Sequence, residues 1–318
     1  MSIRRYVDYM KLNNQDIAKL GEIATLLEVS GYPKPGNVHR TQDFSDMFYE
    51  DFLISSTSIR ENLELVANNA STYYPGMLNQ INVGSCIYGC IRNTQNLVKT
   101  NTNLGISMLL IPMAAAFGAI KDEDTLFNFP HILKTILENS STDDAICLIK
   151  AISLANAGGL DNKTSEYDVN NKDTIDDIRR NNINLYNLFE MSASYDKISY
   201  ELINGLPVIL KYGYPTYAKY MNDYSKNDVT LEIYLTILAN VPDTLITRKY
   251  GDRVAQKVSK QASTILKNTK IASTDRLNQL KEFDTFLRNN KYNPGTTADF
   301  TAASLFVGLV DKYSQSGI

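Results

Sequence analysis

The amino-acid sequence predicts an all-α protein, and three observations support this fold class. Apolar residues recur at helical spacing through most of the 318 residues, and no hairpin dipeptide lies between alternating apolar runs. Glycine occurs 16 times and proline 9 times, below their combined share of about 12% in average proteins. The irregular stretches are short, and none has the composition of a flexible linker. We therefore expect a single compact domain, residues 1–318, with about ten to twelve helices around a buried apolar central helix.

The central helix is predicted from a segment without any charged residue. This segment runs from Thr100 to Ile120 and is mostly apolar from Leu104 onward. It only reaches the lower edge of the roughly 17–25 residues that a membrane-spanning helix needs, and no second segment of this kind occurs. A helix that is buried on all sides in a protein core explains it better. We accordingly expect no membrane association.

Periodicity and start signals place further helices. Apolar residues keep to one helix face in three stretches: Leu231, Leu235 and Leu238; Val254, Val258, Ala262 and Ile265; Phe300, Ala303, Val307 and Val310. Small polar residues that are typical of helix starts stand at 141–144, 273–275 and 296–299. These patterns predict several amphipathic helices in the second half of the chain.

The overall charge argues against two classes of protein. Lys and Arg number 32 and Asp and Glu number 35, so the net charge is −3. Proteins that bind duplex nucleic acid or anionic membranes usually carry a basic surplus, which is absent here. The only cysteines, Cys86, Cys90 and Cys147, provide no disulfide framework and favour a reducing compartment. The first residues lack the apolar core of a signal peptide, so we expect a cytoplasmic protein.

The first polar motif is Pro33-Lys34-Pro35-Gly36, followed by Arg40. Pro35 disfavours a helical conformation at Lys34, so this lysine is predicted to lie on an extended or turned backbone. Its ammonium and the nearby N–H groups would then face an anion. The alternative is a rigid turn that only connects two helices.

Three acids follow, Asp43, Asp46 and Glu50. On a helix they would lie within roughly 60° of each other, where their mutual repulsion favours a bound divalent cation. Acids that complement the dipole of a helix N-terminus are the alternative explanation.

Two later motifs point to anion binding. Asn101 and Thr102 precede the apolar helix, whose first N–H groups can bind an anion, although capping by Thr102 or Asn103 is the simpler explanation. Arg248 and Lys249 follow Pro242-Asp243-Thr244 and can grip phosphates or form a surface ion-pair patch.

The remaining motifs contain glycines and acids. Near the C-terminal end, Asp299 follows Thr296 by three residues, which predicts either a capping box or a carboxylate that serves as a base or metal ligand. A weaker signal in the middle comprises Gly158, Gly159, Asp161 and Asp168. With His39 and His131 as the only histidines, a zinc site built from several histidines is not available.

Taken in order, these motifs resemble those of the triphosphoribosyl-dephospho-CoA synthase family, from about Glu28 to Phe306. The best matching pieces are Pro33-Lys34-Pro35-Gly36, Asp46-Met47, Thr100-Asn101-Thr102, Gly158-Gly159-Leu160, Pro242-Asp243-Thr244 with Arg248-Lys249, and Pro294-Gly295 with Ala298-Asp299. The resemblance implies an all-helical, catalytic domain. It also implies a transferase that moves the triphosphoribosyl group of ATP to the 2′-hydroxyl of 3′-dephospho-CoA and releases adenine.

The resemblance further implies roles for single residues. Contacts with substrate or phosphate fall to Lys34, Gly36, Arg40, Asn101, Thr102, Arg248 and Lys249. Asp43, Asp46 and Glu50 are the candidate ligands of Mg²⁺, which is expected to accompany ATP. The candidate catalytic carboxylates are Asp46, Glu50 and Asp299. We expect Lys34, Asp46 and Asp299 to converge in one cleft.

Two departures from the bacterial pattern of the family concern the acceptor. This chain has Gly36-Asn37-Val38-His39 in place of Gly-Leu-Val-Asp, and Asn103-Leu104 in place of His-Lys. The alternatives are therefore a ribosyltransferase for a related nucleotide acceptor, a Mg²⁺-dependent helical hydrolase of nucleotide or ADP-ribosyl links, or a non-catalytic binding protein. We expect small-molecule partners and no nucleic acid, and the oligomeric state is not predicted.

Overall fold

The computed structural model describes residues 12–121, 128–155 and 172–316. Within these ranges the chain is helical and contains no strand, apart from a single bridge between His39 and Gln42. The helices are α1 (Asn14–Val29), α2 (Tyr49–Ser58), α3 (Arg60–Tyr73), α4 (Val83–Leu97), α5 (Leu104–Ala119), α6 (Phe129–Glu138), α7 (Thr142–Leu154), α8 (Lys172–Arg180), α9 (Leu185–Ser192), α10 (Lys197–Ile203), α11 (Tyr214–Tyr220), α12 (Lys226–Asn240), α13 (Thr244–Tyr250), α14 (Asp252–Asn268), α15 (Thr274–Asn289) and α16 (Gly295–Ser316), with a 3₁₀-helix η1 (Leu78–Gln80) and a π-helix η2 (Ile209–Gly213). The all-α prediction is confirmed.

The described residues contain more helices than the ten to twelve expected. The helices α10, α11 and α13 have seven residues each. Two turns are too few for a periodic apolar pattern to stand out in the sequence, which explains the underestimate.

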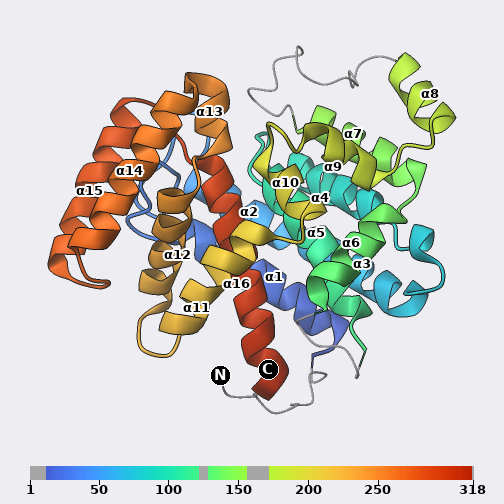
Figure 1. The fold of residues 1–318 in the computed structure, drawn as a ribbon, viewed down its shortest axis with the longest axis horizontal. Coiled ribbons are helices and arrows are strands. Elements are labelled where there is room, and N and C mark those ends of the chain that lie inside the picture. Colours follow the sequence, from blue (N-terminus) through green and yellow to red (C-terminus); the bar gives the residue numbers. More distant parts are fainter. Residues whose placement is uncertain (1–11, 122–127, 156–171, 317–318) are drawn as a thin grey trace.

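The predicted central helix is α5, which Figure 1 shows surrounded by other helices. Every residue of α5 except Gly105 is buried. It packs along α3 and also contacts α1, α4, α6, α10 and α16. A Cβ at Gly118 would overlap the backbone of Ala67, so α3 and α5 approach each other closely. Among the described residues no single helix is long and apolar enough to cross a membrane; α12 and α13 reach that length only as a pair bent by 49°.

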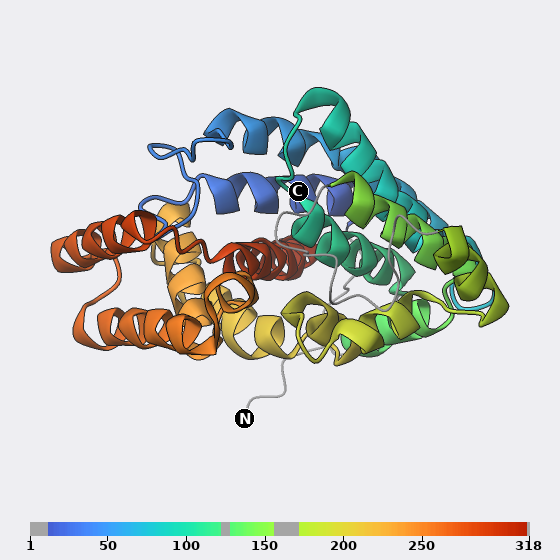
Figure 2. The same cartoon turned by 90° about the horizontal axis from the view of Figure 1, so that it is seen from above.

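Three hydrophobic clusters form the core. The smallest joins α7 and α8, and α12 and α16 contribute to both of the others. The larger cluster contains α5 and most of the first eleven helices. The smaller one joins α12, α13, α14 and α15, which lie to one side in Figure 1. Ala298 belongs to the smaller cluster, whereas Phe300 belongs to the larger. Seen from above, α16 lies between α1 and the layer that contains α11 and α12 (Figure 2), in agreement with its contacts. Asp299 is therefore held where the two clusters meet.

The three predicted helix starts are confirmed to within one residue, since α7 begins at Thr142, α15 at Thr274 and α16 at Gly295. Ser141 accepts a hydrogen bond from the N–H of Asp144 at 3.0 Å, and Ser273 caps α15. The capping box of Thr296 with Asp299 is wrong, because α16 already begins at Gly295. Thr296 therefore lies inside the first turn, and Asp299 is free for another role.

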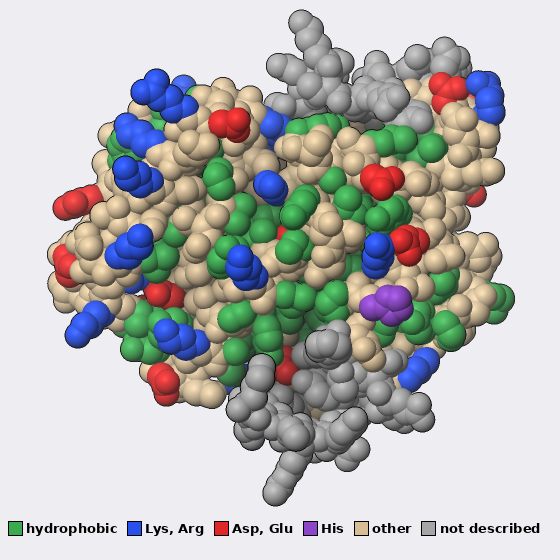
Figure 3. All heavy atoms as spheres, viewed as in Figure 1, with side chains coloured by type: hydrophobic (Ala, Val, Ile, Leu, Met, Phe, Trp, Pro, Cys, Tyr) green, Lys and Arg blue, Asp and Glu red, His purple; other side chains and the backbone are tan. Residues whose placement is uncertain are grey.

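The charges on the surface are mixed, as the net charge suggested. On the face drawn in Figure 3, basic side chains gather over the side of α13, α14 and α15, with acidic side chains among them, and both signs are scattered over the rest of the described residues.

A buried carboxyl at the start of η2 makes the stability depend on pH. Glu201 is fully buried and accepts hydrogen bonds from the N–H groups of Val208 and Ile209 at 2.8 and 3.0 Å. Burial raises the pKa of Glu201 from 4.5 to about 7, although these bonds and Lys197 act in the opposite direction. The folded protein thus holds this proton to a higher pH than the unfolded chain does.

We expect the free energy of unfolding to fall as the pH rises from about 4.5 to about 7. The contribution of Glu201 to this fall is up to about 3 kcal/mol, at about 1.4 kcal/mol per pH unit. Urea denaturation between pH 5 and 8 measures it, and the Glu201→Gln variant should show a flatter dependence. An equally steep dependence in the variant would assign the effect to other groups.

Candidate active site

Asp299 occupies a central position on the first turn of α16. A Cβ added to Gly105 in the first turn of α5 would overlap Oδ2 of Asp299 and lie 2.9 Å from Cδ1 of Ile198 in α10. Only glycine therefore leaves room for the carboxyl group at this point. Asp299 as a whole residue is half-buried, and its carboxyl is desolvated.

Three other carboxyl groups surround Asp299. Burial raises the pKa of Asp299 well above its usual value, and Glu28, Asp243 and Asp196 raise it further, while Lys34 lowers it. These groups come from the end of α1, the starts of α13 and α10, and the loop after α1. A buried carboxyl group with a raised pKa is a candidate for proton transfer.

Lys34 is buried and does not face the solvent. The backbone around it is irregular, as predicted, but the side chain is fully buried and forms an ion pair with Glu28. Its ammonium also donates to the backbone oxygen of Glu28 at 3.2 Å. Burial lowers the pKa of Lys34, and Glu28 and then Asp299 raise it again. The ammonium therefore faces acids of the protein in this structure, not an external anion.

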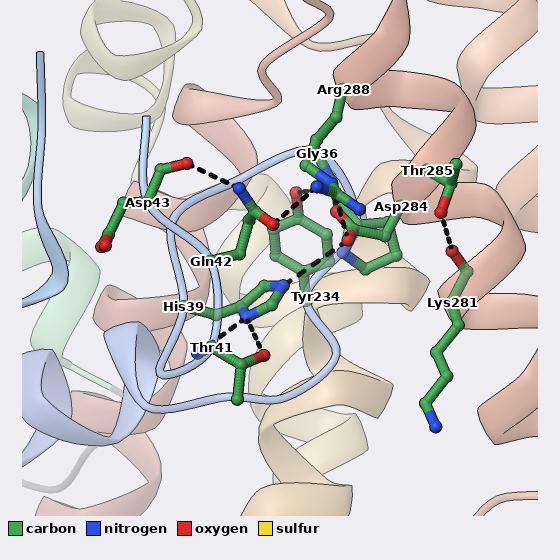
Figure 4. A network of polar contacts seen from close by, with 11 residues as sticks. Gly36, His39, Thr41, Gln42, Asp43, Tyr234, Lys281, Asp284, Thr285 and Arg288 are labelled. Carbon is green, nitrogen blue, oxygen red and sulfur yellow. Dashed lines mark hydrogen bonds and ion pairs between the residues drawn. The ribbon is translucent and has the colours of Figure 1, made fainter. Parts of the chain in front are cut away.

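The loop that carries Lys34 is held by α15 and α12, as Figure 4 shows. Gly36 has a φ of +74° and donates its N–H to Oδ1 of Asp284 at 2.9 Å. Oδ2 of Asp284 lies 3.0 Å from Nε of Arg288 and 3.7 Å from Nε2 of His39. The hydroxyl of Tyr234 donates to the oxygen of Pro35 at 2.8 Å. The loop is thus a fixed support, and the N–H of Gly36 is already engaged.

Arg40 is also engaged within the protein. Its Nε donates to the backbone oxygen of Ser30 at 2.9 Å, and its guanidinium contacts Oδ1 of Asn227 and lies over the ring of Tyr32 at 5.9 Å. These contacts tie the two ends of the Lys34 loop to α12.

The start of α5 lies beside Asp299 and has unsatisfied polar groups. The N–H of Leu104 donates to Oδ1 of Asn101 at 3.2 Å, whereas the Asn103 side chain at the N-cap position makes no capping bond. Within the described part of the chain, Oγ1 of Thr102 and Oδ1 of Asn103 are buried without a hydrogen-bond partner. Such groups are rare in proteins and call for a partner. Of the two predicted residues, Asn101 therefore caps the helix and Thr102 is left with a free hydroxyl.

Arg248 and Lys249 lie exposed in the last turn of α13. Arg248 lowers the pKa of Tyr195, which burial and Asp196 raise. The start of α13 is joined to α16 through the hydrogen bonds between Asp243 and Thr297. No contact among the described residues links Arg248 or Lys249 in the last turn of α13 to Asp299.

Asp43, Asp46 and Glu50 do not share a helix face, so this prediction is wrong. The helix α2 begins only at Tyr49, whose N–H donates to Oδ1 of Asp43 at 2.7 Å. Asp46 is exposed in the irregular segment before α2, and Glu50 is exposed in its first turn. A turn in which the N–H of Phe44 donates to the oxygen of Met47 keeps this segment out of the helix.

The predicted site is therefore only partly assembled. Lys34 and Asp299 come together, but no contact among the described residues links Asp46 to either of them. In the same ranges no group of three Asp, Glu, His or Cys side chains is placed to hold a metal ion, so the three acids do not fit a metal site made by the protein alone. Gly158, Gly159, Leu160, Asp161 and Asp168 lie outside the described residues.

Sequence reasoning gave no role to Glu28, Asp196 or Asp243 in this cluster. Glu28 heads the proline-rich motif but stands six residues before Lys34, with no helical relation to it. Asp196 and Asp243 cap α10 and α13, and a capping aspartate looks the same in the sequence wherever it occurs.

Comparison with known proteins agrees with the fold and the motifs. The sequence matches the profile of the family described as ATP:dephospho-CoA triphosphoribosyl transferase over residues 14–318. The fold is similar to the crystal structure of an Archaeoglobus fulgidus protein that is provisionally assigned as triphosphoribosyl-dephospho-CoA synthase. The TM-score is 0.62 at 21% identity, and the match covers 81% of this chain and 98% of the other. The family profile spans nearly the whole chain, and the chain therefore belongs to the ATP:dephospho-CoA triphosphoribosyl transferase family.

Proposed function

We propose that Asp299 is the general base in the reaction of this family, the transfer of the triphosphoribosyl group from ATP to dephospho-CoA. The observation that carries the proposal is the position of the Asp299 carboxyl. It lies against the first turn of α5 on a half-buried residue, and burial and three neighbouring acids raise its pKa. A raised pKa increases the affinity of a carboxylate for the proton that a general base must take.

The chemistry requires a proton acceptor and charge stabilisation. The 2′-hydroxyl oxygen of dephospho-CoA forms a bond to C1′ of the ATP ribose while the bond from C1′ to adenine breaks. Asp299 takes the hydroxyl proton, and adenine leaves with the electron pair of the broken bond and takes up a proton, so no net proton is released. Such a transfer passes through an oxocarbenium-like state, as in glycoside hydrolysis.

We assign the triphosphate to the space between the start of α5 and the end of α13. The free hydroxyl of Thr102 and the positive end of the α5 dipole lie on one side. The exposed cations Arg248 and Lys249 lie on the other. The hydrogen-bond donors of Lys34, Gly36 and Arg40 are already engaged inside the protein. We therefore propose that these three residues support the site and do not contact phosphate directly.

Mg²⁺ enters this proposal only as the ion that accompanies ATP. Asp43 caps α2, and Asp46 and Glu50 have no contact with Asp299 among the described residues, so no step depends on these acids. A magnesium ion on ATP needs few protein ligands, since phosphate oxygens and waters complete its shell. We also propose a cytoplasmic location, supported by three free cysteines in the structure.

The test is product analysis by mass spectrometry after incubation with ATP, Mg²⁺ and dephospho-CoA. We expect free adenine and a dephospho-CoA that carries the triphosphoribosyl group. Release of ADP or AMP would contradict the proposal. Adenine together with free ribose triphosphate would identify water as the acceptor and favour the hydrolase alternative.

Gly105 provides a structural test of the same site. We expect Gly105→Ala to lower the rate of adenine release at least about tenfold, because the new Cβ displaces the Asp299 carboxyl. The free energy of unfolding should fall by about 1–3 kcal/mol, since the Asp299 carboxyl and Cδ1 of Ile198 must shift to admit the new Cβ. Gly76→Ala is the matched control, because a Cβ at Gly76 meets no atom within 4 Å. Equal activity of both variants would argue against the placement of the base.

A further inference from the structure

An open cavity lies between η2, α11 and α12, and no residue of the candidate active site lines it. Figure 1 shows α11 and α12 side by side, in agreement with their contacts. The volume of the cavity is about 250 Å³. Since a cavity of about 150 Å³ holds one benzene molecule, this one has room for about ten non-hydrogen atoms. It is smaller than the roughly 300–1,000 Å³ of pockets for larger ligands, so a nucleoside triphosphate does not fit.

The wall formed by η2 is a π-helix that is held in place by its neighbours. Gly213, its last residue, packs directly against α16, because a Cβ at this position would overlap Oγ of Ser304. The hydroxyl of Thr216 donates to the backbone oxygen of Tyr212 at 2.7 Å and satisfies this carbonyl within the irregular turn. π-Helices are rare and frequently occur at functional sites. The cavity is therefore shaped by fixed backbone, and its unusual wall favours a functional role.

Two lysines supply positive charge at the cavity. Lys211 and Lys219 are both exposed, and among the described residues neither forms an ion pair with an acid. The ammonium of Lys211 lies 5.0 Å from the ring centroid of Tyr212, and that of Lys219 lies 4.7 Å from the ring centroid of Tyr220. Contacts of this kind attract a lysine to the ring face without removing its charge. Both ammonium groups are thus placed at the cavity and remain available to an anion.

The acid that lines the cavity does not cancel this charge. Glu232 on α12 is buried and forms an ion pair with Arg276, which also donates to the backbone oxygen of Thr269 at 2.8 Å. The charges of Glu232 and Arg276 balance each other, so the two lysines leave a surplus of two positive charges. Within the described ranges the lining hydroxyls of Tyr212 and Thr236 form no printed bond to another side chain, and both can donate to a ligand.

We infer that this cavity is a binding site for a small phosphate anion, such as inorganic phosphate, diphosphate or a small phosphate monoester, held between Lys211 and Lys219. The oxygens of a tetrahedral phosphate point in several directions, so they can accept from ammonium groups and hydroxyls on three elements at once. Lysine binds phosphate as a point charge, whereas planar carboxylates favour the fork of an arginine. Arg276 is already engaged by Glu232. The inference does not depend on the role of Asp299.

The test is NMR of protein with carbon-13-labelled tyrosine rings, assigned with Tyr212→Phe and Tyr220→Phe. The protein is titrated with phosphate, diphosphate and glycerol phosphate at constant ionic strength. We expect saturable shifts of both rings, which distinguishes this cavity from any anion site near Asp299. In the double variant Lys211→Gln with Lys219→Gln the dissociation constant should rise at least about tenfold. Tighter binding of glycerol phosphate than of free phosphate would support the inference and identify a monoester as the source of the anion.

Two further variants separate the cavity from a general effect of charge. Thr236→Leu narrows the cavity and keeps both lysines, so it should weaken diphosphate more than phosphate. Lys257→Gln is the matched control, because Lys257 also lies over an aromatic ring, 5.5 Å from the centroid of Phe286, but does not line the cavity. Its dissociation constants should equal those of the wild type. Thermal denaturation checks that each variant is folded.

Three results would overturn the inference. The first is the absence of saturable shifts up to about 10 mM of each anion, a range that covers millimolar affinity. The second is equal affinity of the folded lysine double variant and the wild type. The third is malonate binding more tightly than phosphate and diphosphate, which would assign the cavity to carboxylates.

Discussion

Replacing Asp299 by asparagine is expected to lower kcat/KM for adenine release by about 10²–10⁴-fold, the usual contribution of a general base. The amide keeps the size of the side chain but cannot accept the hydroxyl proton. The start of α16 is held by Asp243, which accepts hydrogen bonds from the N–H and the hydroxyl of Thr297. The variant keeps these bonds, so the geometry of the site should not change. Steady-state kinetics with dephospho-CoA as acceptor measure the loss.

The stability of this variant separates a chemical effect from a structural one. Burial and three neighbouring acids disfavour the charged form of Asp299 and raise its pKa, so a neutral amide should leave the free energy of unfolding unchanged or increase it. Glu282→Gln, at an exposed position on α15, serves as the control and should keep full activity. Activity of Asp299→Asn within about threefold of the wild type would exclude Asp299 as the base.

The largest loss of stability is expected for Asp243→Ala. Oδ1 of Asp243 accepts from the N–H groups of Leu245 and Ile246 at 2.9 and 3.2 Å, and Oδ2 accepts from the N–H and hydroxyl of Thr297, both at 2.8 Å. One buried carboxylate therefore joins the first turns of α13 and α16. Its removal leaves four donors without an acceptor, which should cost about 2–4 kcal/mol in urea denaturation.

Asp228→Ala provides the comparison for this second prediction. Asp228 is half-buried near the start of α12 and accepts an exposed hydrogen bond from the Ser225 hydroxyl at 2.6 Å. Its loss should cost less than about 1 kcal/mol, since water replaces the bond. Equal losses in both variants would show that Asp243 does not join the two helices. We also expect reduced adenine release in Asp243→Ala, because α16 carries Asp299.

Sequence reasoning succeeded where neighbouring residues decide the structure. The buried helix from Leu104 follows from an uninterrupted apolar segment, and the starts at Ser141 and Ser273 follow from local capping chemistry. The irregular backbone at Lys34 follows from the proline after it. In each case the physical cause lies within a few residues of its effect.

Prediction from the sequence failed where residues that are distant in the chain interact with the same side chain. Lys34 was expected to face an anion that comes from outside the protein. Its ammonium instead pairs with the buried Glu28, and Asp299 also acts on its pKa. The helix expected at Asp43 does not form, because this side chain caps α2 from six residues away. No local pattern reveals that Asp196 and Asp243 converge on Asp299, since only the packing of α10, α13 and α16 brings them together.

The course of α16 through both core clusters has a mechanical consequence. Ala298 is packed in one cluster and Phe300 in the other, so Asp299 sits at the joint between the two. A small displacement of one cluster relative to the other would shift the base relative to Gly105 on α5 before either cluster comes apart. Substitutions deep in α14 or α15, far from any substrate, should therefore change the turnover rate. On heating, catalysis should be lost at a lower temperature than helical structure.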